Sequence, residues 1–345
     1  MADNDETTRR VEGLDPAIDA VAARAAPERA FQSRSWFAAA APDRVVTLVQ
    51  GSADAPLIAL PVARHGKLLR TVPGSYWPFR SFPVAEAATA DDMAALLRAP
   101  AARAALGPAW RVGPIYENDP ALVLLRAAAP RAGWLVAERG IATTWTLDLK
   151  ADDNGNWPRS STMQGLRRKE KRLAENGALD FRFVRGAQWN AATFATLAAV
   201  EAKSWQGVRG DPKFLPGPAR AFWEALATDP AQAERMSAVI LDMGGAPIAF
   251  AFDLDLGTLK YWVANGYDPE LARHSPGKSV LYRNFIEART RGIVRVDCGA
   301  GDGGYKREMD AVAGPRIVDC MILRTGLLAP VAKLAAIAWR RTGQA

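Results

Sequence analysis

A short stretch near the C-terminal end of the chain combines glycines with residues that could transfer protons. Asp297 ends an apolar run, and Asp302, Tyr305 and Lys306 follow it closely. A carboxylate can take a proton from an attacking group, a phenol can protonate a leaving group, and an ammonium group can polarise a carbonyl. The stretch is therefore a candidate site for a reaction that needs proton transfer. The structural alternatives are a turn-forming aspartate, a core tyrosine and a solvated lysine.

A further carboxylate, Glu201, lies toward the end of a helix predicted over 188–204. If this helix continues by one turn, Glu201 and Trp205 share a face, and together they could border an acceptor pocket. The alternative for Trp205 is simple packing at the end of the helix.

The loop from residue 273 to residue 279 separates a strand-like run from a helix predicted over 279–291. Exposed N–H groups in a first helical turn attract anions, and a glycine lets a pyrophosphate approach the backbone. The loop therefore predicts a phosphate site, with an ordinary capped helix as the alternative. Its candidate residues are Arg273, His274, Ser275, Gly277, Lys278 and Ser279.

A helix predicted over 162–176 is strongly basic, because five of the six positions from Arg167 to Arg172 carry positive charge. The charges surround the helix, so part of it must face solvent or an anion. We expect Arg168 and Arg172 to contact a CoA phosphate, an acidic polysaccharide, a lipid head group or RNA. A solvated helix face is the simple alternative.

Helices and strands alternate along the whole chain, which predicts the α/β class with a mixed sheet. Three strand-like runs joined by glycines predict a meander, and a further run ends at Asp297. These runs are 238–243, 246–254, 258–264 and 293–298. The length of 345 residues favours two domains. The predicted divisions are a flexible arm over 1–26, domains over 27–145 and 146–325, and an amphipathic helix over 326–345.

Composition narrows the choice of partners. The net charge of +7 favours anions such as phosphorylated cofactors, nucleic acid or acidic lipid. With two histidines and two cysteines, Cys298 and Cys320, neither in a metal-binding pattern, we expect no metal site and assign both thiols to the core. The polar N-terminus and the lack of a long apolar run predict a cytoplasmic protein. Peripheral contact of the C-terminal helix with the inner membrane is left open.

The order of meander, loop, helix, strand and glycine-rich turn resembles the GNAT superfamily. Within it, the chain resembles the BioF2-like branch, which includes CelD-like acetyltransferases of cellulose biosynthesis and is related to the FemAB peptidoglycan aminoacyltransferases. The resemblance covers Thr144 to Leu323. It rests on the stretches GLRRKEKRLAENG with the following FRFV, VEAKSWQG, YWVANGYDPELARHSPGKSVL, and VDCGAGDGGYKREM.

The resemblance implies tandem GNAT-like acyl-CoA N-acyltransferase domains, of which the C-terminal one is catalytic. It implies a sheet that opens between the strand near Tyr261 and the strand 293–298, with the thioester arm of acyl-CoA in the gap. The loop 273–278 would hold the pyrophosphate, and Tyr261 and Trp205 would contact substrate. Glu201, Asp297 or Asp302 would act as base, Tyr305 as acid and Lys306 as the group that polarises the carbonyl.

The expected reaction is direct transfer of an acyl group, with acetyl the expected one, from acyl-CoA to an amine or hydroxyl of a small molecule or an envelope polysaccharide precursor. Two alternatives stay open. One is FemAB-like aminoacyl transfer from aminoacyl-tRNA, and the other is a non-catalytic module that binds nucleic acid or a membrane surface through the basic helix. No DNA partner is expected, and the oligomeric state is not predicted.

Overall fold

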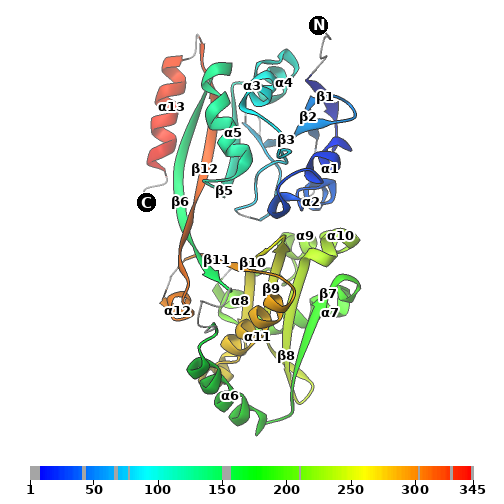
Figure 1. Cartoon of the computed structure of the whole chain (residues 1–345), viewed down its shortest axis with the longest axis vertical. Coiled ribbons are helices and arrows are strands. Elements are labelled where there is room, and N and C mark those ends of the chain that lie inside the picture. The colour runs from blue at the N-terminus through cyan, green and yellow to red at the C-terminus, as the bar shows by residue number, and fades with distance from the viewer. Residues whose placement is uncertain are drawn as a thin grey trace. The chain divides into compact units, whose positions relative to one another are not determined.

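The computed structural model describes residues 8–40, 44–65, 69–76, 78–149, 157–209, 211–301, 304–326 and 329–342. It contains two compact units (Figure 1). Unit 1 comprises Met1–Thr143 together with Pro315–Ala345, and unit 2 comprises Thr144–Gly314. The chain therefore leaves unit 1, forms unit 2 and returns to complete unit 1.

In unit 1 the strands follow the order β1-β2-β3-β4-β5-β12-β6. The pairs β1–β2, β2–β3, β3–β4 and β5–β12 are antiparallel, and β4 and β5 are parallel. The strands are β1 (Arg9–Glu12), β2 (Val45–Gly51), β3 (Pro56–His65), β4 (Leu69–Thr71), β5 (Ala109–Tyr116), β6 (Trp134–Asp148) and β12 (Val312–Arg324). The helices are α1 (Ala17–Ala22), α2 (Arg34–Ala39), α3 (Ala90–Arg98), α4 (Pro100–Leu106), α5 (Pro120–Ala128) and α13 (Ala329–Arg341), with the 3-10 turns η1 (Pro27–Arg29) and η2 (Pro130–Ala132).

Unit 1 differs from the sequence expectation in its first residues. Residues 8–26, expected in a flexible arm, contain β1 and α1, and Ile18 is fully buried. Helices α3 and α4 are separate helices, because Ala99 adopts an extended conformation before Pro100. A proline disfavours helical geometry in the preceding residue, which explains the break.

The C-terminal helix α13 lies against unit 1 by its small side chains. Ala332 and Ala336 pack with Ala137 and Leu323, whereas Val331 and Leu334 on the other side are exposed. Docking on the unit is therefore observed. In the described part of the chain, no helix has both the length and the apolar character needed to cross a membrane.

Unit 2 has the strand order β6-β11-β10-β9-β8-β7. Its own strands are β7 (Leu179–Arg185), β8 (Met236–Met243), β9 (Ala246–Leu256), β10 (Leu259–Tyr267) and β11 (Arg295–Ala300). The helices are α6 (Ser160–Ala174), α7 (Ala191–Lys203), α8 (Trp205–Arg209), α9 (Pro218–Ala227), α10 (Pro230–Arg235), α11 (Pro276–Thr290) and α12 (Gly304–Arg307), with the 3-10 turns η3 (Gly186–Gln188) and η4 (Pro269–His274). The meander predicted from the glycine-separated runs is β8-β9-β10.

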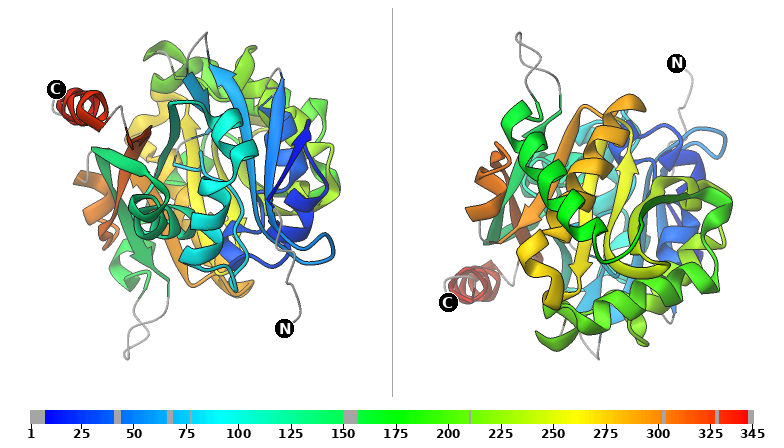
Figure 2. Two further views of the ribbon diagram at one scale, coloured as in Figure 1. Left: turned by 90° about the horizontal axis from the view of Figure 1, so that it is seen from above. Right: turned by 90° about the horizontal axis from the view of Figure 1, so that it is seen from below.

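The sheet of unit 2 is covered on both faces. Helices α6 and α11 lie beside each other over one face (Figure 2), where Leu166 and Phe285 join a core cluster with Val239 of β8. On the other face, the Phe252 ring of β9 meets Phe214 and Trp223 edge to face. The mixed sheet with helices on its faces confirms the predicted α/β class.

A charged cluster is buried between β8, β9, β10 and α11. The Lys260 Nζ lies 2.7 Å from Asp255 Oδ1 and 3.6 Å from Asp253 Oδ2, and it donates a 2.7 Å hydrogen bond to Ser237 Oγ. Asn284 of α11 donates to Asp253. Paired in this way, the charges are tolerated inside the core.

Candidate functional site

Strands β10 and β11 pair over only three residues and then separate. Parallel pairing runs from Leu259 with Arg295 to Tyr261 with Asp297, although β10 continues to Tyr267 and β11 to Ala300. Along this remaining length β10 pairs with β9, and its register shifts between Trp262 and Ala264. The sheet therefore opens beyond Tyr261, as the resemblance implied.

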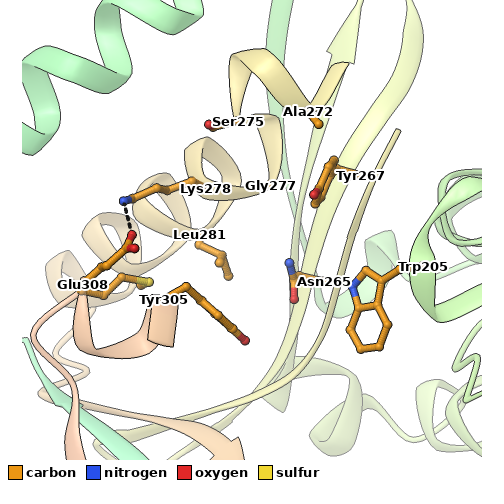
Figure 3. A pocket seen from close by; sticks show the side chains of 11 residues that line it. Trp205, Asn265, Tyr267, Ala272, Ser275, Gly277, Lys278, Leu281, Tyr305 and Glu308 are labelled. Atoms are coloured by element: carbon orange, nitrogen blue, oxygen red, sulfur yellow. Dashed lines mark hydrogen bonds and ion pairs between the residues drawn. The ribbon is translucent and has the colours of Figure 1, made fainter. Parts of the chain in front are cut away.

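A cavity of about 360 Å³ lies in unit 2 beside this part of β10 (Figure 3). The end of β10, the start of α11, α12 and the residues after it, and the first residue of α8 form its walls. Its lining residues are Trp205, Asn265, Tyr267, Ala272, Ser275, Gly277, Lys278, Leu281, Tyr305, Glu308 and Met309.

One wall of the cavity is the N-terminus of α11, which begins at Pro276 rather than at the predicted residue 279. The residue before it, Ser275, has a left-handed backbone with φ of 53°. The N–H groups of Lys278 and Ser279 both donate to the Ser275 carbonyl at 3.1 Å. Because Pro276 has no N–H, Gly277 supplies the first helical N–H, at the end where the helix dipole favours an anion.

Glycine at position 277 is required by packing. A Cβ placed there would lie 2.7 Å from Cδ1 of Tyr267, well inside contact distance. Any side chain would therefore displace the Tyr267 ring, which lines the same cavity.

Two lysines bring positive charge to this wall. Lys169 of α6 donates a 2.8 Å hydrogen bond from Nζ to Ser275 Oγ, and Lys278 Nζ lies 3.4 Å from Glu308 Oε2. Helix α6 also contacts α11 through the ion pair between Glu170 and Arg283, at 2.7 Å. The basic helix α6 is thus held next to the N-terminal end of α11.

The other charged candidates of this region lie away from the cavity wall. Arg273 is exposed, and its Nε donates to Nε2 of His274 at 3.0 Å, so that nitrogen of His274 acts as an acceptor. Arg168 and Arg172 are exposed on α6, and Ser279 is buried in the first turn of α11.

Tyr305 extends from α12 into the cavity, with its side chain directed toward the side of Asn265 and Trp205 (Figure 3). It is 48% exposed, and its ring meets the edge of Trp262 at 5.9 Å. A half-exposed phenol beside a cavity can exchange a proton with a bound molecule.

Asp297 of β11 and Lys306 of α12 are buried next to the end of β11. The Asp297 Oδ1 accepts a 2.7 Å hydrogen bond from the Gly299 N–H. Lys306 Nζ donates to the carbonyls of Gly299 at 3.0 Å and Ala300 at 2.8 Å. Neither residue lines the cavity, so these contacts position the turn that leads to Tyr305. Asp302 lies outside the described residues.

Glu201 and Trp205 do not share a helix face, because α7 ends at Lys203 and α8 starts again at Trp205. Glu201 is fully buried, and its carboxylate accepts the N–H groups of Lys213, Phe214 and Leu215 at 2.6 to 3.0 Å. Trp205 is 58% exposed and lines the cavity. Tyr261 is buried on β10, opposite Asp297 in register.

Sequence reasoning missed Lys169, Asn265, Tyr267 and Glu308. The first shares a helical face with Leu166 and Leu173 at spacings of one turn, which is a usable signal. Asn265 and Tyr267 lie just beyond the predicted run 258–264, so a longer prediction for β10 would have included them. Glu308 follows Tyr305 by one helical turn.

The two thiols are buried, as expected of core residues. Burial, with a smaller effect of neighbouring Asp297, raises the pKa of Cys298 to about 12, and burial also raises the pKa of Cys320. A thiolate nucleophile at neutral pH is therefore disfavoured. Among the described residues, no group of three or more His, Cys, Asp or Glu side chains could hold a metal ion.

Part of unit 2 matches a known protein family. Residues 160–307 match the family described as acetyltransferase (GNAT) domain. No curated protein matches the sequence.

Solved structures resemble almost the whole chain at low sequence identity. FemX is 13% identical with a TM-score of 0.61, and the match covers 95% of this chain and 100% of FemX. The C-terminal domain of a candidate lysylphosphatidylglycerol synthetase from Agrobacterium fabrum is 16% identical with a TM-score of 0.54, covering 93% of this chain and 94% of that domain. A conserved protein of unknown function from Bacteroides thetaiotaomicron is 14% identical with a TM-score of 0.55, and the match covers 91% of this chain and 100% of that protein. These likenesses show the fold, and residues 160–307 form a GNAT-fold acetyltransferase domain.

Proposed function

We propose that unit 2 transfers an acyl group directly from acyl-CoA to an amine or a hydroxyl. The carrying observation is the cavity between the end of β10 and the N-terminus of α11, located where β10 and β11 separate. An elongated thioester needs such an opening beside an anion-binding helix end, and acyl-CoA would supply the activated acyl group.

The residues of the cavity suit this ligand. The Gly277 N–H and Lys278 would contact the pyrophosphate, and Lys169 would add charge through its position on Ser275. Exposed Trp205 would offer an aromatic surface to the acceptor, which fits a ring-bearing molecule such as a sugar. An envelope polysaccharide precursor is therefore one class of acceptor to test.

In the proposed reaction, the acceptor nitrogen or oxygen bonds to the acyl carbon while the bond from carbon to sulfur breaks. Tyr305 would donate its phenolic proton to the departing thiolate, and the proton lost by the acceptor would return to the phenolate through water. Glu308, the carboxylate that lines the cavity, would orient Lys278. Asp297 and Lys306 act as positioning residues, because their contacts hold the turn before Tyr305.

Calorimetric titration with acetyl-CoA, longer acyl-CoAs and CoA tests the donor. We expect saturable binding by the wild-type protein and about tenfold weaker binding by Lys278→Gln. Arg167→Gln is the matched control, because it removes one exposed charge from α6 and should bind normally. Gly277→Glu is a poorer test, since the new side chain would displace Tyr267. Absence of binding by the folded wild-type protein would contradict the proposal.

Aminoacyl transfer from tRNA is a second candidate, favoured by the likeness to FemX over 95% of the chain and by the basic helix α6 beside the cavity. It predicts that aminoacyl-tRNA binds and that acyl-CoA does not. Binding measurements with both donors under the same salt conditions separate the two candidates.

A further inference from the structure

Unit 1 carries a row of arginines across three neighbouring strands, independent of the cavity in unit 2. Arg64 of β3 lies directly opposite Arg70 of β4. Arg44 directly precedes the first pair of β2 and β3, Val45 with Ala63, and it lines the same small space as Arg64 and Arg70. Three arginines from neighbouring segments of the chain therefore border one space.

The row lines a small cavity. A space of about 170 Å³ is bordered by Arg10, Arg44, Arg64 and Arg70, above Val46 and Val62. A second space of about 670 Å³ shares Arg10, Arg44 and Arg64 with it. The floor is thus apolar, and the rim is built from arginines.

The positive charge of this row has no counterpart in the described part of the chain. Arg10 pairs with Glu12, but Arg44, Arg64 and Arg70 form no ion pair and donate no side-chain hydrogen bond to a described residue. Like charges directly opposite each other on adjacent strands repel and destabilise a sheet. Arg44 also has a left-handed backbone, with φ of 53°, which is uncommon for a residue with a side chain.

We propose that these four arginines form a binding site for a phosphate-bearing ligand of unit 1, a phosphomonoester or a diphosphate. Guanidinium groups hold phosphate oxygens with paired N–H donors, and a doubly or more highly charged anion can offset several of them at once. A carboxylate carries too little charge to offset three cations. The larger space that adjoins the small one would accept the remainder of the ligand.

The proposal predicts opposite effects of one variant with and without ligand. Without anion, Arg64→Gln combined with Arg70→Gln should leave the Tm equal to or higher than that of the wild type, because repulsion is removed. With inorganic diphosphate at about 100-fold above its Kd, the wild-type Tm should rise by about 3 °C or more, and the variant Tm should not. All proteins carry Lys278→Gln, so that the anion site proposed for unit 2 is weakened equally in every sample.

Arg167→Gln with Arg168→Gln is the matched control, since it removes the same charge from unit 2 and should keep the rise. Arg44→Gly provides a second test. Glycine adopts the left-handed backbone of residue 44 without strain, and the substitution removes one guanidinium group. An equal rise in the Arg64 and Arg70 variant, or loss of the rise in the control, would overturn the site. So would loss of the rise in 150 mM KCl, which would indicate an adventitious ion only. Vesicles containing phosphatidate, tested in parallel, distinguish a lipid phosphate from a free one.

Discussion

Asp253 has an incomplete set of partners for a fully buried carboxylate. Its Oδ2 faces Asn284 and Lys260, whereas Oδ1 has no hydrogen-bond partner in the described part of the chain. Burial outweighs the attraction of Lys260 and raises the pKa of Asp253 to about 6. The neighbouring Asp255 behaves in the opposite way, because Lys260 and Arg291 lower its pKa despite burial. The pKa values of the two carboxylates beside Lys260 are therefore shifted in opposite directions.

This difference predicts a pH-dependent stability. Because the folded-state pKa of Asp253 exceeds that of the unfolded chain, the folded state binds its proton more tightly, and the contribution of Asp253 to the free energy of unfolding falls as pH rises from about 4 to 6. Asp253→Asn removes this titration. The difference in free energy of unfolding between the two proteins should therefore change across that window and level off above it. Urea denaturation at closely spaced pH values measures it, and a constant difference would refute the assignment.

At the scale of elements, the break between α7 and α8 is what separates Glu201 from Trp205. Ser204 is extended, and the three N–H groups of residues 213–215 converge on the Glu201 carboxylate. Glu201 therefore holds the loop after α8, and Trp205 is free to line the cavity. A carboxylate with three backbone donors is a strong local anchor.

Glu201→Gln should accordingly lower the free energy of unfolding by about 2 kcal/mol, because the amide nitrogen cannot accept these N–H groups.

Tyr305→Phe should instead leave stability nearly unchanged and lower kcat by about 100-fold without weakening donor binding. Denaturation curves and steady-state rates for both variants test this pair. A Glu201→Gln protein of normal stability with no activity would instead identify Glu201 as a base.

Hydrophobic patterning predicted the meander, because burial on a sheet face imposes a two-residue period. The run of basic residues predicted the charged helix, and the opening of the sheet followed from the family resemblance. The predicted start of α11 at residue 279 was wrong, because the helix begins at Pro276. It is preceded by Ser275 in a left-handed backbone conformation, which the residue type alone does not predict. The Glu201 carboxylate accepts backbone N–H groups of residues 213–215, and Lys306 donates to carbonyls of β11. Hydrophobic patterns do not reveal such contacts between a side chain and the backbone.

At the scale of the whole molecule, Asp319 of β12 joins parts of the chain that are far apart in sequence. Its carboxylate, fully buried, accepts paired hydrogen bonds from Arg111 of β5 and from Arg139 of β6 at 2.7 to 3.1 Å. The Arg139 guanidinium lies 3.9 Å from the ring centroid of Trp339 in α13. The Asp319 carboxylate thus adds to the strand pairing between β12 and β5 that holds residues 315–345 in unit 1.

Asp319→Asn should destabilise unit 1 by about 3 kcal/mol, because it leaves two partly buried arginines without a counterion. The backbone amides of unit 2 should stay protected from hydrogen exchange, since this unit has its own hydrophobic core. Hydrogen exchange followed by mass spectrometry resolves the two units, and CoA titration of the same variant should give an unchanged Kd. Equal loss of protection in both units would show that they unfold as one.

The position of β12 between β5 and β6 has a consequence for synthesis. On the ribosome, every residue of unit 2 emerges before Pro315, so unit 2 can close while unit 1 still lacks an interior strand. Until β12 is translated, β5 and β6 each keep an unpaired edge, and such edges are templates for aggregation. Chains halted before β12 should therefore engage chaperones through the first segment synthesised, and chains extended beyond β12 should release them.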